Sequence, residues 1–283
     1  MLTRFAPSPT GELHLGHAYS AVLAHEAARS AKGGFLIRID DIDGNRSRED
    51  YVAASLADLA WLGIAWDGDP VRQSQRLDIY RAALDDLRAR ALVYPCFCTR
   101  ADIAASLAAP HGPSGVIYPG TCRALLPAER DRRLVDEPHA WRLDMARAVM
   151  FAGDLDWEEA GQGMRRADPA AHGDVVLARK DAPASYHLAS TLDDAEMGVT
   201  HVIRGADLIA STDVHRLLQV LLDLPTPLYR HHALVCGPDG KRLAKRDAAA
   251  SLASLRAAGI DGLSLAAALA RGELPTGYSL QMP

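Results

Sequence analysis

The sequence has few cysteines and no long apolar run, and both features restrict what the protein can be. Its 283 residues include four cysteines, which form no disulfide-dense pattern and predict a reducing compartment. The first residues lack the basic region and apolar core of a secretory signal. No uninterrupted apolar run approaches the roughly 20 residues that cross a bilayer. We therefore expect a soluble cytoplasmic protein without a membrane partner.

Charge and hydrophobic content restrict the function class less strongly. The formal net charge of -5 argues against non-specific coating of nucleic acid but allows a local basic face. Hydrophobic residues make up 48% of the chain, enough to bury a full core. We expect either one large domain with an insertion or two domains.

A proline-stiffened turn joins a predicted strand to a predicted helix at the start of the chain. Residues 2–6 are rich in apolar side chains, and Pro7 and Pro9 prevent regular structure until the chain reverses at Gly11. From about residue 16 to 31 the apolar residues recur at helical spacing.

A second buried strand is predicted at residues 35–39. A strand, a helix and a strand in this order imply a parallel pair with a right-handed crossover. Ligands of such sheets bind at the carboxyl ends of the strands, where Ser8 and Asp40 fall.

Two histidines, His14 and His17, lie three residues apart in the first turn of the predicted helix, so both can face one ligand. The backbone N–H groups and the dipole of that turn suit phosphate oxygens. Gly16 leaves room for a flat purine ring against the backbone. By itself a His-x-Gly-His motif is short enough to arise by chance, as two capping or packed histidines.

Three cysteines, Cys96, Cys98 and Cys122, lie in a stretch rich in proline and glycine. They can bind zinc with a fourth ligand from His111 or Tyr118. Imidazole binds metal in its neutral form, whereas phenol must first lose a proton near pKa 10. Reduced, buried thiols without metal are the alternative interpretation.

The rest of the chain alternates predicted helices and strands. We expect helices at 50–62, at 77–91 and from the candidate caps Ser211 and Thr212 to about 223. Strands are expected at 141–143, 174–178 and 200–203. The parallel sheet is expected to resume at 174–178, after acidic and glycine-rich turns at 152–163. Helical segments at 251–258 and 263–270 precede an irregular tail from Pro275.

Two further features suggest a charged ligand. Arg204 is predicted at the carboxyl end of a strand, and guanidinium is the natural partner of a substrate carboxylate. A basic run, Lys241 to Arg246, follows a glycine turn. Such a run is usually a solvated loop, but a loop lysine can also neutralise phosphate charge during a reaction.

The run Arg4-Phe5-Ala6-Pro7-Ser8-Pro9-Thr10-Gly11, joined to the histidine pair, resembles the signature of class I aminoacyl-tRNA synthetases of the glutamyl branch. The resemblance implies an α/β fold: a Rossmann-like class I synthetase catalytic domain with a zinc-binding insertion and a short helical C-terminal segment. The expected divisions are residues 1–94 and 172–246 for the two halves of the nucleotide fold, 95–171 for the zinc-containing, acceptor-binding insertion, and 247–283 for the helical segment.

The same resemblance assigns roles to residues. Catalysis is expected from His14, His17 and Lys245, and ATP binding from His14, Gly16, His17, Arg242 and Lys245. Glutamate binding is expected from Arg4, Phe5, Ala6, Pro7, Ser8, Asp40, Tyr186 and Arg204. The cysteine pattern resembles the zinc site of the family members that glutamylate queuosine, which places Cys96, Cys98, Tyr118 and Cys122 on one structural zinc ion.

The chain departs from the family pattern at a few of these positions. Asp40 stands where the family has a glutamate. Arg242 and Ala244 replace the first lysine and the central serine of the Lys-Met-Ser-Lys-Ser loop, and Lys241 can compensate for the missing lysine. Cys236 has no assigned partner.

The implied activity is activation of L-glutamate by ATP and Mg²⁺, followed by glutamyl transfer to the cyclopentene-diol of queuosine in the tRNA(Asp) anticodon, by a monomer. The residues after Arg246 are too few for an anticodon-binding domain. A short or discriminating glutamyl-tRNA synthetase, another class I nucleotidyltransferase and a catalytically weak ATP- or tRNA-binding module are the alternatives.

Overall fold

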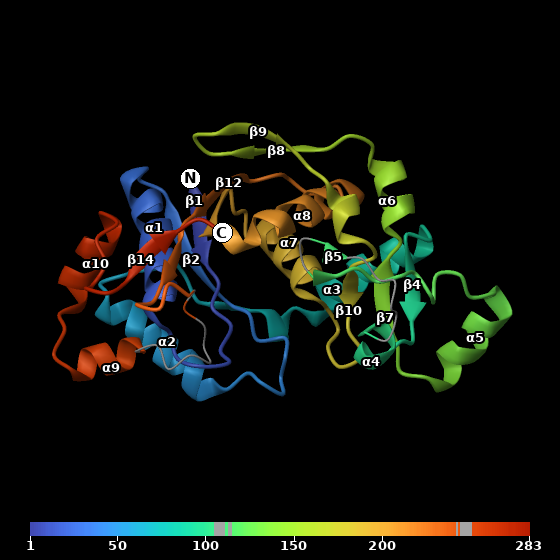
Figure 1. Ribbon diagram of the computed structural model, residues 1–283, viewed down its shortest axis with the longest axis horizontal. Helices are drawn as coiled ribbons and strands as arrows, with labels where there is room; N and C mark the ends of the chain where they lie inside the picture. The colour runs from blue at the N-terminus through green and yellow to red at the C-terminus, as the bar shows by residue number, and fades with distance from the viewer. Residues whose placement is uncertain (105–110, 113–114, 242, 244–250) are drawn as a thin grey trace.

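The computed structural model describes residues 1–104, 111–112, 115–241, 243 and 251–283 (Figure 1). The strands are β1 (Leu2–Phe5), β2 (Gly34–Ile39), β3 (Val71–Arg72), β4 (Val93–Cys96), β5 (His111–Gly112), β6 (Gly115–Val116), β7 (Ala140–Leu143), β8 (Asp156–Glu159), β9 (Gly163–Arg166), β10 (Val176–Ala178), β11 (His201–Gly205), β12 (Leu228–His232), β13 (Leu234–Cys236) and β14 (Ser279–Gln281). The α-helices are α1 (Leu15–Ser30), α2 (Glu49–Trp61), α3 (Leu77–Ala89), α4 (Arg100–Ala104), α5 (Pro127–Asp136), α6 (Met145–Ala152), α7 (Tyr186–Glu196), α8 (Ile209–Leu221), α9 (Leu252–Ala257) and α10 (Gly262–Ala270).

The predicted strand, helix and strand at the start of the chain are confirmed as β1, α1 and β2. β1 and β2 pair in parallel with Leu2 opposite Gly34, and β3 extends the sheet beyond β2. Three alanines of α1, Ala18, Ala21 and Ala28, are fully buried. The N–H of Thr200 donates to the carbonyl of Leu2, which ties the segment before β11 to β1. β1 therefore lies beside β11, in the second half of the fold.

A second sheet has the order β11-β12-β8-β9 and contains a hairpin that the sequence did not predict. β11, β12 and β8 are parallel, and β9 returns antiparallel to β8. Along β8 the side chains of Trp157 and Glu159 are buried, while Asp156 and Glu158 are exposed. Three of the four residues of β8 are acidic, and glycines flank it. Both features are typical of turns, so the sequence did not indicate a strand here.

The strand predicted at residues 174–178 exists as β10, but the expectation that it resumes the parallel sheet is wrong. β10 pairs antiparallel with β7, which also pairs antiparallel with β4. Apolar residues mark a strand as buried, but they do not give its direction or its partner. The sheet β10-β7-β4 supports the region expected to hold the zinc site.

The C-terminal segment packs against the start of the chain. In Figure 1 the helices α9 and α10 lie beside α1 and α2. Leu252, Leu265 and Leu269 are buried in the same core as Leu59. The predicted helices are confirmed, but the tail is not wholly irregular, because β14 pairs antiparallel with β13. This pairing uses backbone groups, and the exposed side chains of Ser279 and Gln281 carried little signal for it.

Within the described residues, no helix combines the length and apolar character needed to cross a membrane.

Candidate active site

A cavity of about 410 Å³ opens where β1, β2 and β11 end and α1 begins. Its wall includes every described residue that was predicted to bind glutamate or ATP: Arg4, Phe5, Ala6, Pro7, Ser8, His14, Gly16, His17, Asp40, Tyr186 and Arg204. The wall also contains residues that the sequence did not single out for this site: Ser20, Arg38, Ile203, Gly205, Asp207, Leu208, His232, Leu234, Val235 and Leu243. The residues that the sequence placed at this edge of the sheet therefore share one space.

The two histidines are held by the backbone at the start of α1. His14 is the N-cap residue, and its Nδ1 accepts the N–H of Gly16 at 3.1 Å. His17 Nδ1 accepts the N–H of His14 at 3.1 Å, and the two rings stack with their centres 3.8 Å apart. A neutral imidazole that accepts through Nδ1 carries its proton on Nε2. The pair therefore offers two Nε2–H donors at the positive end of a helix.

Gly16 packs closely against the His14 ring. A Cβ atom at this position would lie 3.1 Å from Cε1 and 3.2 Å from Nδ1 of His14. An alanine would press on the His14 ring, so the glycine keeps that imidazole in place. Its expected contact with the adenine ring remains a prediction.

Behind the cavity lies a buried cluster of two arginines and three aspartates: Arg4, Arg38, Asp40, Asp193 and Asp194. Arg4 Nε lies 2.8 Å from Asp194 Oδ1, and Arg38 Nη1 lies 2.6 Å from the same oxygen. Arg38 Nε also donates to Asp40 at 2.7 Å. Burial raises the pKa of Asp194, but Arg4 and Arg38 outweigh it and bring the pKa below its ordinary value. The Asp194 carboxyl therefore stays ionised and pairs with both arginines.

The sequence missed the roles of Arg38 and Asp194. The available signal was an arginine inside an apolar strand, because a buried guanidinium requires a carboxylate partner. Asp40 lies on the cavity wall as predicted, although its carboxyl is bound to Arg38. Burial raises the pKa of Asp40 despite Arg38. Its expected contact with the amino acid stays a prediction.

Arg204, on β11, is surrounded by neutral acceptors. Nη1 donates to Tyr186 Oη at 3.1 Å, and Nη2 donates to Thr212 Oγ1 at 2.7 Å and to the Leu208 carbonyl at 3.2 Å. Nε donates to His231 Nε2 at 3.2 Å. In the described part of the chain, no carboxylate forms an ion pair with Arg204 within 4.0 Å. Nη1 also lies 3.3 Å from His215 Nδ1, so the N–H groups of Arg204 have protein partners, while its charge is not balanced by a carboxylate among the described residues. A substrate carboxylate can supply that balancing charge.

The expectation that Ser211 and Thr212 cap a helix is wrong. A short 3₁₀ turn at Ala206–Leu208 leads directly into α8, whose N-cap is Leu208, so both residues lie inside the helix. Both are buried, and the Thr212 hydroxyl contacts Arg204. Serine and threonine favour caps when exposed, but here a buried charge determines the role of Thr212.

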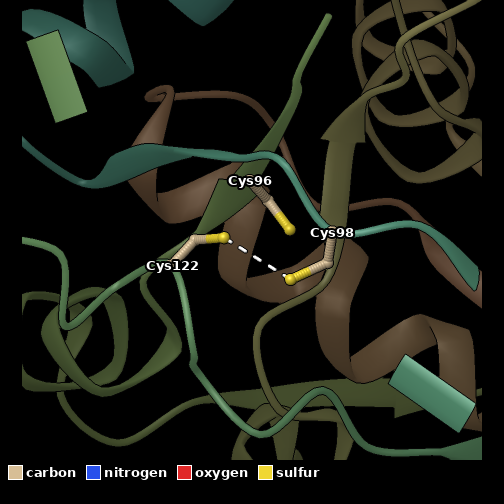
Figure 2. A group of neighbouring side chains, drawn as sticks. All are labelled: Cys96, Cys98 and Cys122. Atoms are coloured by element: carbon tan, nitrogen blue, oxygen red, sulfur yellow. Dashed lines mark hydrogen bonds between the residues drawn. The ribbon is translucent and has the colours of Figure 1, made fainter. Parts of the chain in front are cut away.

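The three cysteines predicted to bind zinc come together (Figure 2). The sulfur atoms of Cys96, Cys98 and Cys122 all lie within 4.8 Å of one another, and those of Cys98 and Cys122 are 3.5 Å apart. A tetrahedral zinc with Zn–S bonds near 2.3 Å needs sulfurs about 3.8 Å apart, so this spacing fits. The Tyr118 hydroxyl lies 3.5 Å from Cys98 Sγ and accepts the N–H of Cys122 at 2.8 Å. The phenol thus completes a four-atom cluster of S₃O composition.

Most of the predicted phosphate-binding loop lies outside the described residues: Arg242, Ala244, Lys245 and Arg246. Leu243 is described, and its N–H donates to the Val235 carbonyl at 3.2 Å. Its side chain lines the cavity. The expected roles of Arg242 and Lys245 remain predictions.

Comparison with known sequences gives a consistent result. The family described as tRNA synthetases class I (E and Q), catalytic domain, matches residues 1–276. A glutamyl-Q tRNA(Asp) synthetase of Rhodobacter capsulatus is 49% identical over 271 residues, covering 92% of this chain and 96% of that protein. One from Symbiobacterium thermophilum is 45% identical, covering 90% of this chain and 81% of its own.

Solved structures agree with the sequence relatives. A glutamate-tRNA synthetase from Elizabethkingia anophelis superimposes with a TM-score of 0.74 at 29% identity. The match covers 87% of this chain and 53% of that one, so the chain spans about half the length of this structural relative.

Proposed function

Because this chain belongs to the class I tRNA synthetase catalytic-domain family for glutamate and glutamine, we propose that it activates L-glutamate with ATP and transfers the glutamyl group to queuosine in tRNA(Asp). The fold is the mixed α/β catalytic domain of that family. The chain is a ligase, and the named relatives favour the queuosine-directed reaction over charging of a tRNA terminus.

In the proposed first step, a glutamate carboxylate oxygen bonds to the α-phosphorus of ATP. The bond between that phosphorus and the oxygen bridging to the β-phosphate breaks, and pyrophosphate leaves. Arg204 and Tyr186 hold the amino acid together with Arg4 and Ser8, by pairing with its charges. The reaction needs positioning and charge stabilisation more than covalent chemistry.

The histidine pair supplies charge stabilisation. The Nε2–H groups of His14 and His17 are oriented before ATP arrives, since each Nδ1 is fixed by a backbone N–H. Donors held in place in this way cost no reorganisation when phosphate charge develops. We assign Lys245 and Arg242 to the ATP phosphates. Mg²⁺ bound with ATP supplies further positive charge.

In the proposed second step, a hydroxyl of the cyclopentene-diol attacks the carbonyl carbon of the adenylate. An ester forms, the bond between the carbonyl carbon and the phosphate oxygen breaks, and AMP leaves with the hydroxyl proton on its phosphate. The same cavity must receive the modified base, which fits recognition of exposed loop nucleotides by proteins. We propose that the enzyme works as a cytoplasmic monomer.

We further propose that Cys96, Cys98, Tyr118 and Cys122 hold one structural zinc ion. The site is closed by four protein atoms, as structural zinc sites are. When bound, zinc crosslinks the segments that carry the four ligands. A region with few buried apolar residues gains folding stability in this way.

One observation carries the proposal: the Arg204 guanidinium and the His14–His17 pair face the same cavity. The test is transfer of labelled glutamate to two tRNA pools, one with queuosine and one from cells unable to make it. Labelling of the first pool alone is the expected result. Equal labelling of both pools, lost after periodate oxidation of the terminal ribose in the queuosine-free pool, would identify a glutamyl-tRNA synthetase instead. ATP binding without glutamate-dependent pyrophosphate exchange would identify a binding module.

A further inference from the structure

A buried acid and a histidine stand behind Arg204, on strands outside the predicted site. Glu159 ends β8, and His231 lies on the neighbouring strand β12; their side chains are 2% and 1% exposed. Glu159 Oε1 accepts the backbone N–H of His231 at 2.7 Å, and Oε2 lies 2.6 Å from His231 Nδ1. Both carboxylate oxygens are therefore occupied by one residue.

This contact fixes which imidazole nitrogen carries the proton. A carboxylate only accepts hydrogen bonds, so Nδ1 of His231 must donate. Burial and the nearby Arg204 guanidinium lower the pKa of His231 to about 4, so the ring is neutral at pH 7 and has one proton. Nε2 is then an acceptor, and it receives the Nε–H of Arg204 at 3.2 Å.

We propose that Glu159 and His231 are positioning residues that orient the Arg204 guanidinium for the substrate carboxylate. The inference rests on the proposed function, because it takes glutamate to be the ligand of Arg204. The pair leaves the charge of Arg204 uncancelled, since a neutral ring separates the carboxylate from the guanidinium. A carboxylate in direct contact with Arg204 would instead compete with the substrate for its charge.

The variant Glu159→Gln tests this proposal with almost no change in shape. The backbone N–H of His231 can only donate, so the amide oxygen must face it and the amide NH₂ must face Nδ1. Nδ1 of His231 then accepts a hydrogen bond, and the ring proton moves to Nε2. The Nε2–H of His231 and the Nε–H of Arg204 are then two donors facing each other, so the hydrogen bond between these residues is lost. Glu158→Gln is the matched control, because Glu158 is the exposed neighbour on the same strand.

The first measurement is glutamate-dependent ATP–pyrophosphate exchange. We expect Glu159→Gln to raise the KM for glutamate about tenfold or more, as for a lost hydrogen bond to a charged group, while the KM for ATP stays as in Glu158→Gln. A general structural defect would alter both constants. Equal glutamate KM values in the two variants, in a wild type that exchanges, would overturn the proposal.

The second measurement needs no activity and no altered fold. Nitrogen-15 NMR of the wild-type histidine side chains distinguishes the two neutral tautomers, and His231→Asn identifies the relevant signal. We expect His231 to carry its proton on Nδ1 at pH 7. A proton on Nε2, or a charged ring, would overturn the proposal. A wild type that lacks exchange but shows the Nδ1–H tautomer would instead count against the proposed function.

Discussion

Arg4 Nε and Asp194 Oδ1 lie 2.8 Å apart, although 190 positions separate the two residues in the chain. Asp194 also accepts a hydrogen bond from Arg38, so one carboxylate binds two buried guanidinium groups at the rear of the cavity. The contact joins the first strand to helix α7. It therefore sets both the stability of the fold and the position of Arg4.

Replacing Asp194 with asparagine is expected to lower the free energy of unfolding at pH 7 by about 3–5 kcal/mol, because two buried charges lose their partner. The pKa of Asp194 is lowered in the folded state, so its stabilisation is present above the unfolded pKa of about 3.9 and is lost as the pH falls through the folded value. Urea unfolding of both proteins at several pH values tests this. The exposed Asp78→Asn is the control, and an equal deficit at pH 7 and pH 3 would contradict the assignment.

Arg204→Lys keeps the positive charge but removes the planar pair of donors. We expect the KM for glutamate to rise by about 10- to 100-fold, in line with 1.5–3 kcal/mol for a hydrogen bond to a charged group. The KM for ATP should change little. Arg230→Lys, at an exposed position of β12, is the control. A lysine variant with wild-type glutamate KM would remove Arg204 from the pocket.

His14→Asn separates capping from catalysis, because asparagine is itself a good N-cap residue. The melting temperature should stay close to that of the wild type. The rate of pyrophosphate exchange should fall by about 100-fold or more, as for loss of a preorganised donor. Near-normal exchange would mean that the His14 ring acts only as a cap.

The zinc proposal predicts one zinc ion per chain by elemental analysis. Cys98→Ser should lose the metal, because one thiolate of the cluster is removed. Cys236→Ser should retain it, since Cys236 lies on β13 outside the cluster. Tyr118→Phe should release zinc to a chelator more readily. Full zinc retention by Cys98→Ser would rule out the site.

Lys245→Ala is expected to abolish adenylate formation and leave the melting temperature unchanged, since this lysine is assigned to the ATP phosphates. Lys241→Ala, four residues earlier, shows whether a neighbouring lysine shares the task. Normal pyrophosphate exchange by the Lys245 variant would remove this residue from the site.

The sequence predicted those parts of the site that lie close together in the chain. The turn before α1 and the histidine spacing are local, and the structure places residues 4–8, His14, Gly16 and His17 around one cavity. Arg204 could be found because it comes directly after the apolar residues Val202 and Ile203, near the end of β11.

The partners of these residues could not be predicted in the same way. Asp194 forms an ion pair with Arg38, and Glu159 forms a hydrogen bond with His231. Both contacts arise because segments far apart in the sequence pack together. Burial of side chains on β8 depends on that packing, so the acidic sequence of this strand predicted a turn instead. The direction of β10 was missed for the same reason: strand direction depends on a neighbour that local propensity does not specify.

The 190-residue separation of Arg4 and Asp194 also sets an order of events during synthesis. At roughly 5–20 residues per second, Asp194 is made about 10–40 s after Arg4. Until then the first strand lacks the carboxylate that receives its arginine. The nascent chain therefore completes its substrate pocket late, and contacts of such long sequence separation slow its folding further.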